Sequence, residues 1–260
     1  MDTPRKYVQL AVEDHIARVR LNRPPVNALG QDLVAELAEL ARSIHQNEDV
    51  WVVTLRASGR AFCAGADLKE RAVEPQSQVM QTVKSIQDMV VAWIEVPQPV
   101  LAAIHGAALG GGLELALAAD IIVSSEAATL GFPEVSLGII PGATGTQRLA
   151  QRTTRGVANK WVLSGSQFNA LEALEDGVVD YVFPQASFEQ EFNRVVSQVV
   201  SCAPIALRQA KKALNGPSKP ALRRGLIAET DCYAQLIATE DRTEALRAFA
   251  ENRKPIWRGK

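Results

Sequence analysis

The alternation of strand, turn and helix in this chain is clearest in PVLAAIHGAALGGGLELALAADIIV, residues 99–123. The stretch opens with an apolar run at 99–104 and closes with another at 121–123, and both runs are typical of covered strands. Between them lie a glycine run at 110–112, which predicts a turn, and a short helix. A strand, a glycine turn, a helix and a strand in this order favour an α/β fold.

The flanking sequence continues the alternation. The expected elements are a hairpin at 7–12 and 15–21, an amphipathic helix at about 31–47, a strand at 51–55, a glycine-bearing turn at 58–66, a helix at about 76–94 and a last strand around 178–183. The chain after this last strand is expected to be almost wholly helical, apart from a break at 216–220. We therefore place a boundary between a core, residues 1–197, and a helical region, residues 198–260.

The composition narrows the class of protein. Hydrophobic residues make up 47% and charged residues 22% of 260, which are the proportions of an ordinary folded domain. Because 28 basic residues face 29 acidic ones, the formal charge is −1, and the basic footprint of a nucleic-acid-binding protein is absent. The longest apolar stretch, 96–123, is interrupted by prolines and by polar residues, so it predicts buried core rather than a membrane span.

The cysteines and the N-terminal sequence bear on the compartment. Cys63, Cys202 and Cys232 cannot all pair within one chain, which favours a reducing environment. The first residues carry charge without a following apolar run, so neither a secretory signal nor a transit peptide is recognised. We expect a cytoplasmic protein.

The first candidate for a ligand-binding turn is FCAGADLKE, residues 62–70. Small residues at 64–66 allow a ligand to approach the backbone, and N–H groups at the start of a helix are free to donate to an anionic oxygen. Taken alone, the same residues also fit a tight turn followed by a helix that begins at Asp67.

Two acids stand in apolar surroundings. Glu114 follows the glycine run and is flanked on every side by leucine and alanine, so it must be paired, protonated or functional. Glu134 lies in the apolar loop 131–142. A structural salt bridge for Glu114 and a solvated loop position for Glu134 remain alternatives at this point. Two carboxyl groups in different environments can also divide the roles of acid and base.

Other catalytic and binding motifs are missing from the sequence. It has no cysteine or histidine cluster at metal-ligand spacing, no GxxxxGK[ST] loop and no GxSxG elbow. The three histidines, His15, His45 and His105, are scattered, and none is assigned a catalytic role. Proton transfer between carboxyl groups is therefore the chemistry that the residues favour.

Four segments in this order resemble the enoyl-CoA hydratase/isomerase (crotonase) superfamily: FCAGADLKE, ALGGGLELALAADI, PEVSLGIIPGATGTQRL and the later GVVDYVFP. The resemblance runs essentially from end to end. It implies a ClpP-like α/β spiral of repeated ββα units, with the coenzyme A (CoA) thioester site in residues 1–197. It also implies a C-terminal helical trimerisation region, residues 198–260, in a homo-oligomer that is usually a hexamer of two trimers.

The resemblance implies a chemistry as well. Two backbone N–H groups, those of Ala66 and Gly111, would form an oxyanion hole for the thioester carbonyl. Glu114 would deprotonate the attacking water and Glu134 would deliver a proton to the α-carbon. Because family members that only shift a double bond commonly lose the first acid, retention of both favours hydration. No cofactor is implied, since CoA is part of the acyl-CoA substrate.

The CoA and substrate contacts are carried over from the family by position. They are Arg23, Pro25, Val26, Ala64, Asp67, Leu68, Lys69, Gly142, Tyr233, Arg253 and Lys254. Arg253 or Lys254 would replace, against a phosphate, the lysine that the family usually has at the position of Asn252, so this contact departs from the family pattern.

Within the superfamily, the likeness is greatest to 3-methylglutaconyl-CoA hydratases of leucine degradation. It rests on FCAGADLKERA, GGGLELALA, IIPG and the tail residues 229–235. A substrate with a second carboxylate needs a distal cation, and Lys69 or Arg71 are the candidates. A general short-chain enoyl-CoA hydratase, acting on crotonyl-CoA, is the alternative.

RNA binding is a function of another class, known for one animal member of this subgroup through a lysine-rich first helix. The corresponding helix here has one basic residue, Arg42, against five acids in or beside it: Asp32, Glu36, Glu39, Glu48 and Asp49. This surplus of negative charge repels phosphate and no aromatic platform compensates, so nucleic acid is not an expected partner.

Overall fold

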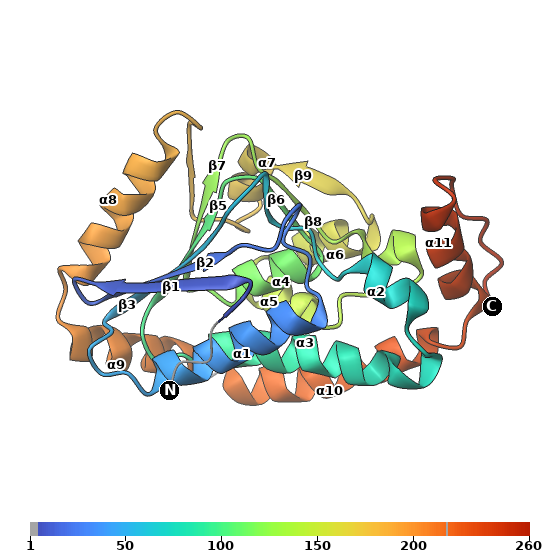
Figure 1. Ribbon diagram of the computed structural model, residues 1–260, viewed down its shortest axis with the longest axis horizontal. Coiled ribbons are helices and arrows are strands. Elements are labelled where there is room, and N and C mark those ends of the chain that lie inside the picture. Colours follow the sequence, from blue (N-terminus) through green and yellow to red (C-terminus); the bar gives the residue numbers. More distant parts are fainter. Residues whose placement is uncertain (1–4, 217) are drawn as a thin grey trace.

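The computed structural model describes residues 5–216 and 218–260, and its strands form two sheets (Figure 1). The six-stranded sheet has the order β1-β2-β3-β5-β7-β10, in which only the β1–β2 pair is antiparallel. Its strands are β1 Val8–Glu13, β2 Ile16–Leu21, β3 Val52–Ala57, β5 Val100–Ile104, β7 Ile121–Ser125 and β10 Tyr181–Phe183.

The second sheet is smaller and has the order β4-β6-β8-β9, with β9 antiparallel to β8. Its strands are β4 Ala61–Cys63, β6 Ala107–Leu109, β8 Thr129–Gly131 and β9 Gln167–Asn169. Strands β3, β5 and β7 each lead directly into the next strand, which belongs to the smaller sheet. The chain thus places one strand in each sheet and then a helical segment, three times in succession, which is the expected α/β spiral of ββα units.

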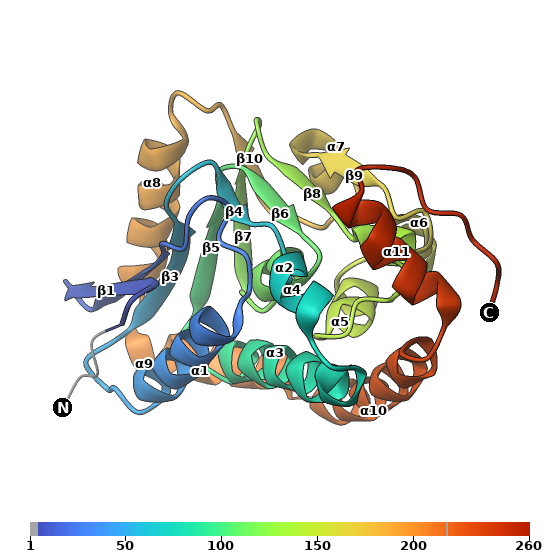
Figure 2. The ribbon, with the colours of Figure 1, turned by 45° about the vertical axis from the view of Figure 1, so that its right-hand side comes forward.

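The helices complete the spiral and continue beyond it. They are α1 Gln31–His45, α2 Leu68–Val73, α3 Val79–Ile94, α4 Gly111–Leu117, α5 Gly145–Arg152, α6 Arg155–Leu163, α7 Ala170–Glu175, α8 Phe188–Val200, α9 Pro204–Asn215, α10 Lys219–Leu236 and α11 Glu240–Ala250, with short 3-10 helices η1 Gln76–Gln78 and η2 Pro133–Leu137. Figures 1 and 2 show α1, α3 and α10 running side by side along one edge.

The hairpin and the helices and strands expected around 31–47, 51–55, 76–94 and 99–123 are confirmed, with ends that shift by a few residues. The last strand is shorter than predicted, because the N–H groups of Val178 and Val179 both donate to the carbonyl of Ala173 and so turn the chain before β10. After β10 the regular elements of the described residues are the helices α8 to α11. The boundary predicted at 197 falls within α8.

Both faces of the large sheet are buried at its central strands β3, β5 and β7, and the alternation along these strands explains how. In β5, Leu101 and Ala103 face α8, whose Phe188 and Phe192 cover this side. The intervening residues of β5 face the main core with α1 and α3. Successive side chains on a strand point to opposite faces, so an uninterrupted apolar run is what a doubly covered strand requires.

The small sheet positions the candidate site. Its strands β4, β6 and β8 are parallel neighbours, so their carboxyl ends lie at one edge. The segments that follow these ends are the turn at 64–67, the glycine run at 110–112 and η2. In α/β proteins the carboxyl ends of parallel strands are the usual place for a ligand.

Candidate active site

A pocket of roughly 600 Å³, open to solvent, lies where these three segments meet. Gly110 has φ +51°, and a Cβ at this position would stand 2.5 Å from Oε1 of Glu134. At Gly112 a Cβ would stand 2.1 Å from the carbonyl oxygen of Cys63, so α4 packs directly on the end of β4. Only glycine allows these approaches, which explains the glycine run of the sequence.

Two backbone N–H groups of the pocket lack an acceptor. Ala66 and Gly111 both line the pocket, and the Ala66 nitrogen lies 3.9 Å from the Cβ position of Gly111. The bridge that joins the 62–70 turn to Leu29 uses the carbonyl of Gly65 and the N–H of Asp67, and so leaves the Ala66 N–H out. Across residues 5–216 and 218–260, neither N–H donates to a chain acceptor. This pair can bind one anionic oxygen.

Glu114 enters the pocket from α4, where every residue is buried. It is 3% exposed, and its Oε1 accepts hydrogen bonds from the N–H groups of Ala143 and Gly145, each at 2.8 Å. These bonds fix the carboxyl group against the loop before α5. The alternative of a structural salt bridge is wrong, because no described Lys or Arg pairs with Glu114.

Glu134 lies on η2, directly after Pro133. The solvated alternative is wrong, because Glu134 is 7% exposed and lines the pocket. Its Oε2 is buried without a hydrogen-bond partner among the described residues. A buried carboxyl oxygen that lacks a partner is costly unless the group is protonated or meets a ligand.

Burial dominates the electrostatics of both acids. It raises the pKa of Glu134 to about 8, and the negative charge of Glu229 adds to this rise. Burial also raises the pKa of Glu114 well above its usual range, followed by repulsion from Glu134 and Glu229, while the two backbone N–H bonds act in the opposite direction. A pKa of about 8 leaves Glu134 protonated at neutral pH, whereas the two N–H bonds to Glu114 favour its carboxylate form against the effect of burial.

A third buried acid, Glu229 of α10, was not predicted as a site residue. It is 3% exposed and accepts the N–H groups of Thr144 at 2.8 Å and Thr146 at 3.2 Å. The signal in the sequence is faint: Glu229 shares one helix face with the buried Leu222 and Tyr233, at spacings of seven and four residues.

Several predicted substrate contacts line the same pocket: Ala64, Leu68, Arg71, Gly142 and Tyr233. Tyr233 is buried with Val79 and Val83, and a Cβ at Gly142 would stand 2.9 Å from the Tyr233 ring. Arg71 is ion-paired to Glu74 at 2.7 Å. The remaining lining is largely apolar.

Other predicted contacts lie beside the pocket. Arg23 pairs with Asp67 at 2.8 Å and with Glu70 at 3.0 Å. Val26 accepts the N–H of Ala64, so the segment that contains Pro25 runs along the turn at 64–67. Lys69 does not line the pocket, and its N–H is used in the capping of α2 by Asp67.

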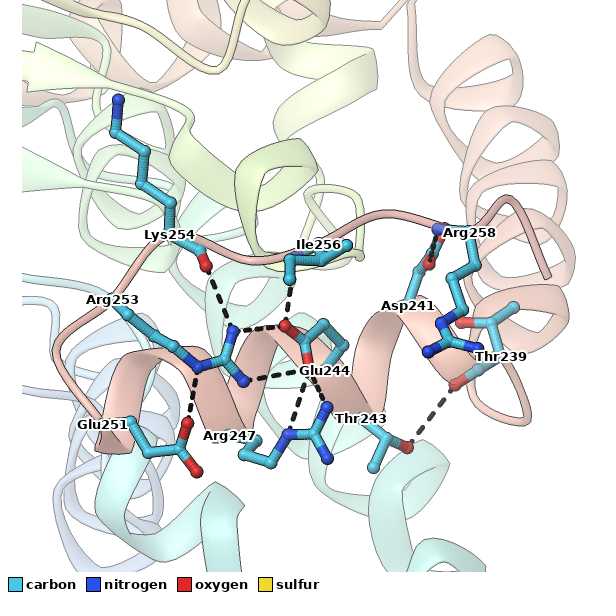
Figure 3. A network of polar contacts seen from close by, with 10 residues as sticks. All are labelled: Thr239, Asp241, Thr243, Glu244, Arg247, Glu251, Arg253, Lys254, Ile256 and Arg258. Carbon is cyan, nitrogen blue, oxygen red and sulfur yellow. Dashed lines mark hydrogen bonds and ion pairs between the residues drawn. The ribbon is translucent and has the colours of Figure 1, made fainter.

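Arg253 and Lys254 lie in another part of the molecule. Figure 3 shows the Arg253 guanidinium between Glu244 of α11 and Glu251, while the Lys254 side chain points away from this cluster. Neither residue lines the pocket. In this chain Arg253 serves the C-terminal fold, because it joins α11 to the segment after it.

The described residues hold no group of three or more histidine, cysteine or acidic side chains arranged for a metal ion. Nor does any helix in the described ranges combine the length and apolar character needed to cross a membrane.

Comparison with known proteins shows the family of the chain. Residues 11–260 match the family model for enoyl-CoA hydratase/isomerase. The chain is 43% identical to the protein YngF of Bacillus subtilis over 248 residues, covering 95% of each chain. It is 38% identical to mouse mitochondrial methylglutaconyl-CoA hydratase, covering 90% of this chain and 76% of that protein. It is 36% identical to the 2,3-dehydroadipyl-CoA hydratase of Escherichia coli, covering 95% and 97%.

The chain is also similar to solved structures of enoyl-CoA hydratases. An enoyl-CoA hydratase from Bacillus anthracis superposes with a TM-score of 0.80 and 39% identity, covering 98% of this chain and all of that one. The similarity thus extends over the spiral and the C-terminal helices alike.

Proposed function

This chain belongs to the enoyl-CoA hydratase/isomerase family, and from that premise we propose that it adds water across the α,β double bond of an enoyl-CoA thioester. One observation carries the proposal. Two buried carboxyl groups, those of Glu114 and Glu134, line a single pocket in which the N–H groups of Ala66 and Gly111 have no acceptor among the residues that the structure describes. A hydration needs a base, an acid and hydrogen-bond donors for the thioester oxygen, and these four groups can supply them.

The proposed reaction begins with the thioester oxygen bound by the two N–H groups. Glu114 removes a proton from water while the water oxygen bonds to the β-carbon, and the π electron pair of the double bond moves towards the thioester oxygen as an enolate. Fixed donors are worth about 3–4 kcal/mol each at such an oxygen. Glu134, protonated at neutral pH, then gives its proton to the α-carbon. Dehydration reverses the two roles.

The proposed substrate is 3-methylglutaconyl-CoA, hydrated to 3-hydroxy-3-methylglutaryl-CoA. Two relatives are named for substrates with a second carboxylate, methylglutaconyl-CoA and 2,3-dehydroadipyl-CoA. Arg71 is the candidate cation for that carboxylate, because it lines the pocket with a side chain only 11% exposed.

One observation favours the second candidate, crotonyl-CoA. Glu74 already pairs with Arg71 and is itself only 6% exposed in its side chain. A distal carboxylate would have to share the guanidinium with Glu74, whereas a short alkyl chain needs only the apolar side chains of Val83, Ile86 and Ile140.

The proposal extends to a homo-oligomer in which the C-terminal helices meet neighbouring subunits. Ile205 and Leu214 of α9 and Ile227 of α10 are exposed by 74%, 81% and 65%, so these helices offer apolar side chains for a contact between subunits. No cofactor takes part, since CoA arrives with the substrate.

The test is kcat/KM for 3-methylglutaconyl-CoA and for crotonyl-CoA, with Glu114→Gln and Glu134→Gln beside the wild type. Loss of both activities in both variants supports the two-carboxyl mechanism, and retained activity in both rejects the site. Arg71→Met combined with Glu74→Gln, which removes both charges together, should weaken turnover of the diacid alone. Lys69→Ala, outside the pocket, is the control. Equal effects on both substrates would assign the chain to general short-chain hydration.

A further inference from the structure

Four consecutive residues before and at the start of α5 are bonded alternately to two carboxyl groups. The N–H groups of Ala143 and Gly145 both donate to Oε1 of Glu114 at 2.8 Å. The N–H of Thr144 donates to Oε1 of Glu229 at 2.8 Å, and that of Thr146 to Oε2 at 3.2 Å. The Thr146 hydroxyl also donates to Oε2 of Glu229. Residues 143–146 are therefore held between two acids from different helices.

We propose that Glu229 is a positioning residue for the base Glu114 and acts through residues 143–146. The inference rests on the proposed function, in which Glu114 activates water. Glu229 itself does not line the pocket, so it has no contact with substrate. It acts on the reaction from outside the pocket, by holding residues 143–146 and through them the direction of Glu114.

The backbone of the clamped segment supports this role. Thr144 has φ +88°, a conformation that a β-branched residue adopts only when its surroundings impose it. Gly145 is in close contact as well, since a Cβ there would stand 2.8 Å from Oε1 of Glu114. Because Glu229 takes the N–H groups on one side of the segment, those on the other side remain turned to Glu114.

The elements around Glu229 hold it in place. The side-chain amide of Gln87 on α3 donates to the carbonyl of Gly142 at 3.3 Å and to the Thr230 hydroxyl at 3.4 Å, so it ties α10 to the start of the clamped segment. Tyr233, one helical turn after Glu229, lines the pocket. The helix that carries Glu229 therefore also forms one wall of the site.

The charges that face Glu229 are those of Glu114 from α4 and Glu134 from η2. Tyr233 is the titratable neighbour on α10, and Arg71 and Arg242 face its hydroxyl. Within residues 5–216 and 218–260, no lysine or arginine forms an ion pair with Glu229. Burial raises the pKa of Glu229, which its hydrogen bonds from Thr146 and Thr144 oppose, and its charge raises the pKa of both other acids. Glu229 thus affects ionisation as well as orientation.

The test compares Glu229→Gln and Glu229→Asp with Asp231→Asn, an exposed acid on the same helix. The readout is the pH dependence of kcat and KM on whichever enoyl-CoA the wild type hydrates. Because a displacement of about 1 Å costs on the order of 100-fold, Glu229→Gln should lower kcat by roughly 10–100-fold with KM nearly unchanged. It should also move the pH profile to lower pH, since a negative charge near Glu114 and Glu134 is lost. Asp231→Asn should do neither.

Glu229→Asp separates the two effects. It keeps the charge but withdraws the carboxylate by one methylene, so kcat should fall while the pH profile stays in place. If Glu229→Gln does not fold, this variant decides alone: wild-type kcat in a folded Glu229→Asp enzyme overturns the proposal. Unchanged kcat and pH profile in a folded Glu229→Gln enzyme also overturns it.

The Glu114→Gln background distinguishes this inference from the proposed function. If Glu114→Gln keeps full activity, the assignment of the base is wrong whatever Glu229 does. If Glu114→Gln is inactive and Glu229→Gln is normal, only the positioning role fails. If both ideas hold, adding Glu229→Gln to Glu114→Gln lowers the residual rate no further, because residues that act as a unit are not additive.

Discussion

Two glutamates in different regions of this molecule expose the same small fraction of their surface, but their pKa values are shifted in opposite directions. Glu134 in the pocket and Glu244 on α11 are each 7% exposed. Burial raises the pKa of Glu134 to about 8, whereas hydrogen bonds from Arg253 and then Arg247 hold the pKa of Glu244 far below its usual range. The same small exposed fraction therefore does not decide the charge of an acid. Glu134 is desolvated deep in the pocket, which favours its neutral form, whereas Glu244 lies near the surface against two guanidinium groups that favour its carboxylate.

The neighbours differ in kind. Glu244 accepts from two guanidinium groups and from the N–H of Ile256 at 3.0 Å, so its two oxygens are fully used (Figure 3). Glu134 has a buried oxygen with no hydrogen-bond partner in the described part of the chain. Glu244, whose two oxygens both accept hydrogen bonds, ties α11 to the C-terminal segment. Glu134, whose pKa is raised to about 8, holds a proton that it can donate to a substrate. The comparison thus separates a structural carboxylate from a reactive one.

The largest expected effect comes from exchanging each acid for its amide. Glu134→Gln should lower kcat for hydration by about 1,000-fold, because it removes the proton that the α-carbon receives. Glu244→Gln, the matched control, should leave kcat near wild type in the folded enzyme and lower Tm. Steady-state kinetics and thermal unfolding of both variants are the measurements. An inactive Glu244→Gln enzyme beside an active Glu134→Gln enzyme would contradict the assignment of Glu244 as structural and Glu134 as reactive.

The next largest effect is on the free energy of unfolding, whose change with pH has opposite signs for Glu134 and Glu244. A pKa raised to about 8 from an unfolded value near 4.5 means that the folded state binds more protons between these pH values, so Glu134 makes the protein less stable as pH rises through this window. Glu134→Gln should therefore be more stable than wild type at pH 8, by roughly 1–3 kcal/mol, and lose this advantage at pH 5.

Glu244 should behave in the opposite way. Its lowered pKa contributes stability that is present above an unfolded value near 4.5 and lost as pH falls further. Urea unfolding of both variants at several pH values and one protein concentration checks the two slopes. If the difference in unfolding free energy from wild type changed with pH in the same direction for both variants, the environments of Glu134 and Glu244 would not differ as described.

The smallest effect comes from giving Glu134 a cation like those of Glu244. Leu137 lines the pocket three residues after Glu134 on η2, and side chains at this spacing eclipse in a 3-10 helix. Leu137→Lys should lower the pKa of Glu134, so that the fall in kcat/KM at high pH begins about 1 pH unit lower. Leu137→Met keeps the size without the charge and should leave that limb in place. If the fall in kcat/KM at high pH begins at the same pH in Leu137→Lys as in the wild type, a group other than Glu134 causes that fall.

Much of the fold and of the candidate site could be predicted from the sequence, because the residue patterns that indicate them lie within short segments. An acid inside an all-apolar helix after three glycines marked Glu114, and the run at 99–104 alternates faces as a doubly covered strand must. The smaller sheet gave no such signal. Its strands are three residues long, too short for a period of two to be recognised, and their partners lie tens of residues away.

The sequence by itself determined the α/β order, the glycine turns and the two acids of the pocket, since each depends on residues within one or two turns of the chain. Only the tertiary structure decided which charges meet. Glu229 holds Thr144 from 85 residues away, and Arg253 is committed to Glu244 rather than to the pocket. Desolvation and Coulomb energies depend on atomic distances between separate elements, and those distances exist only once the elements have packed.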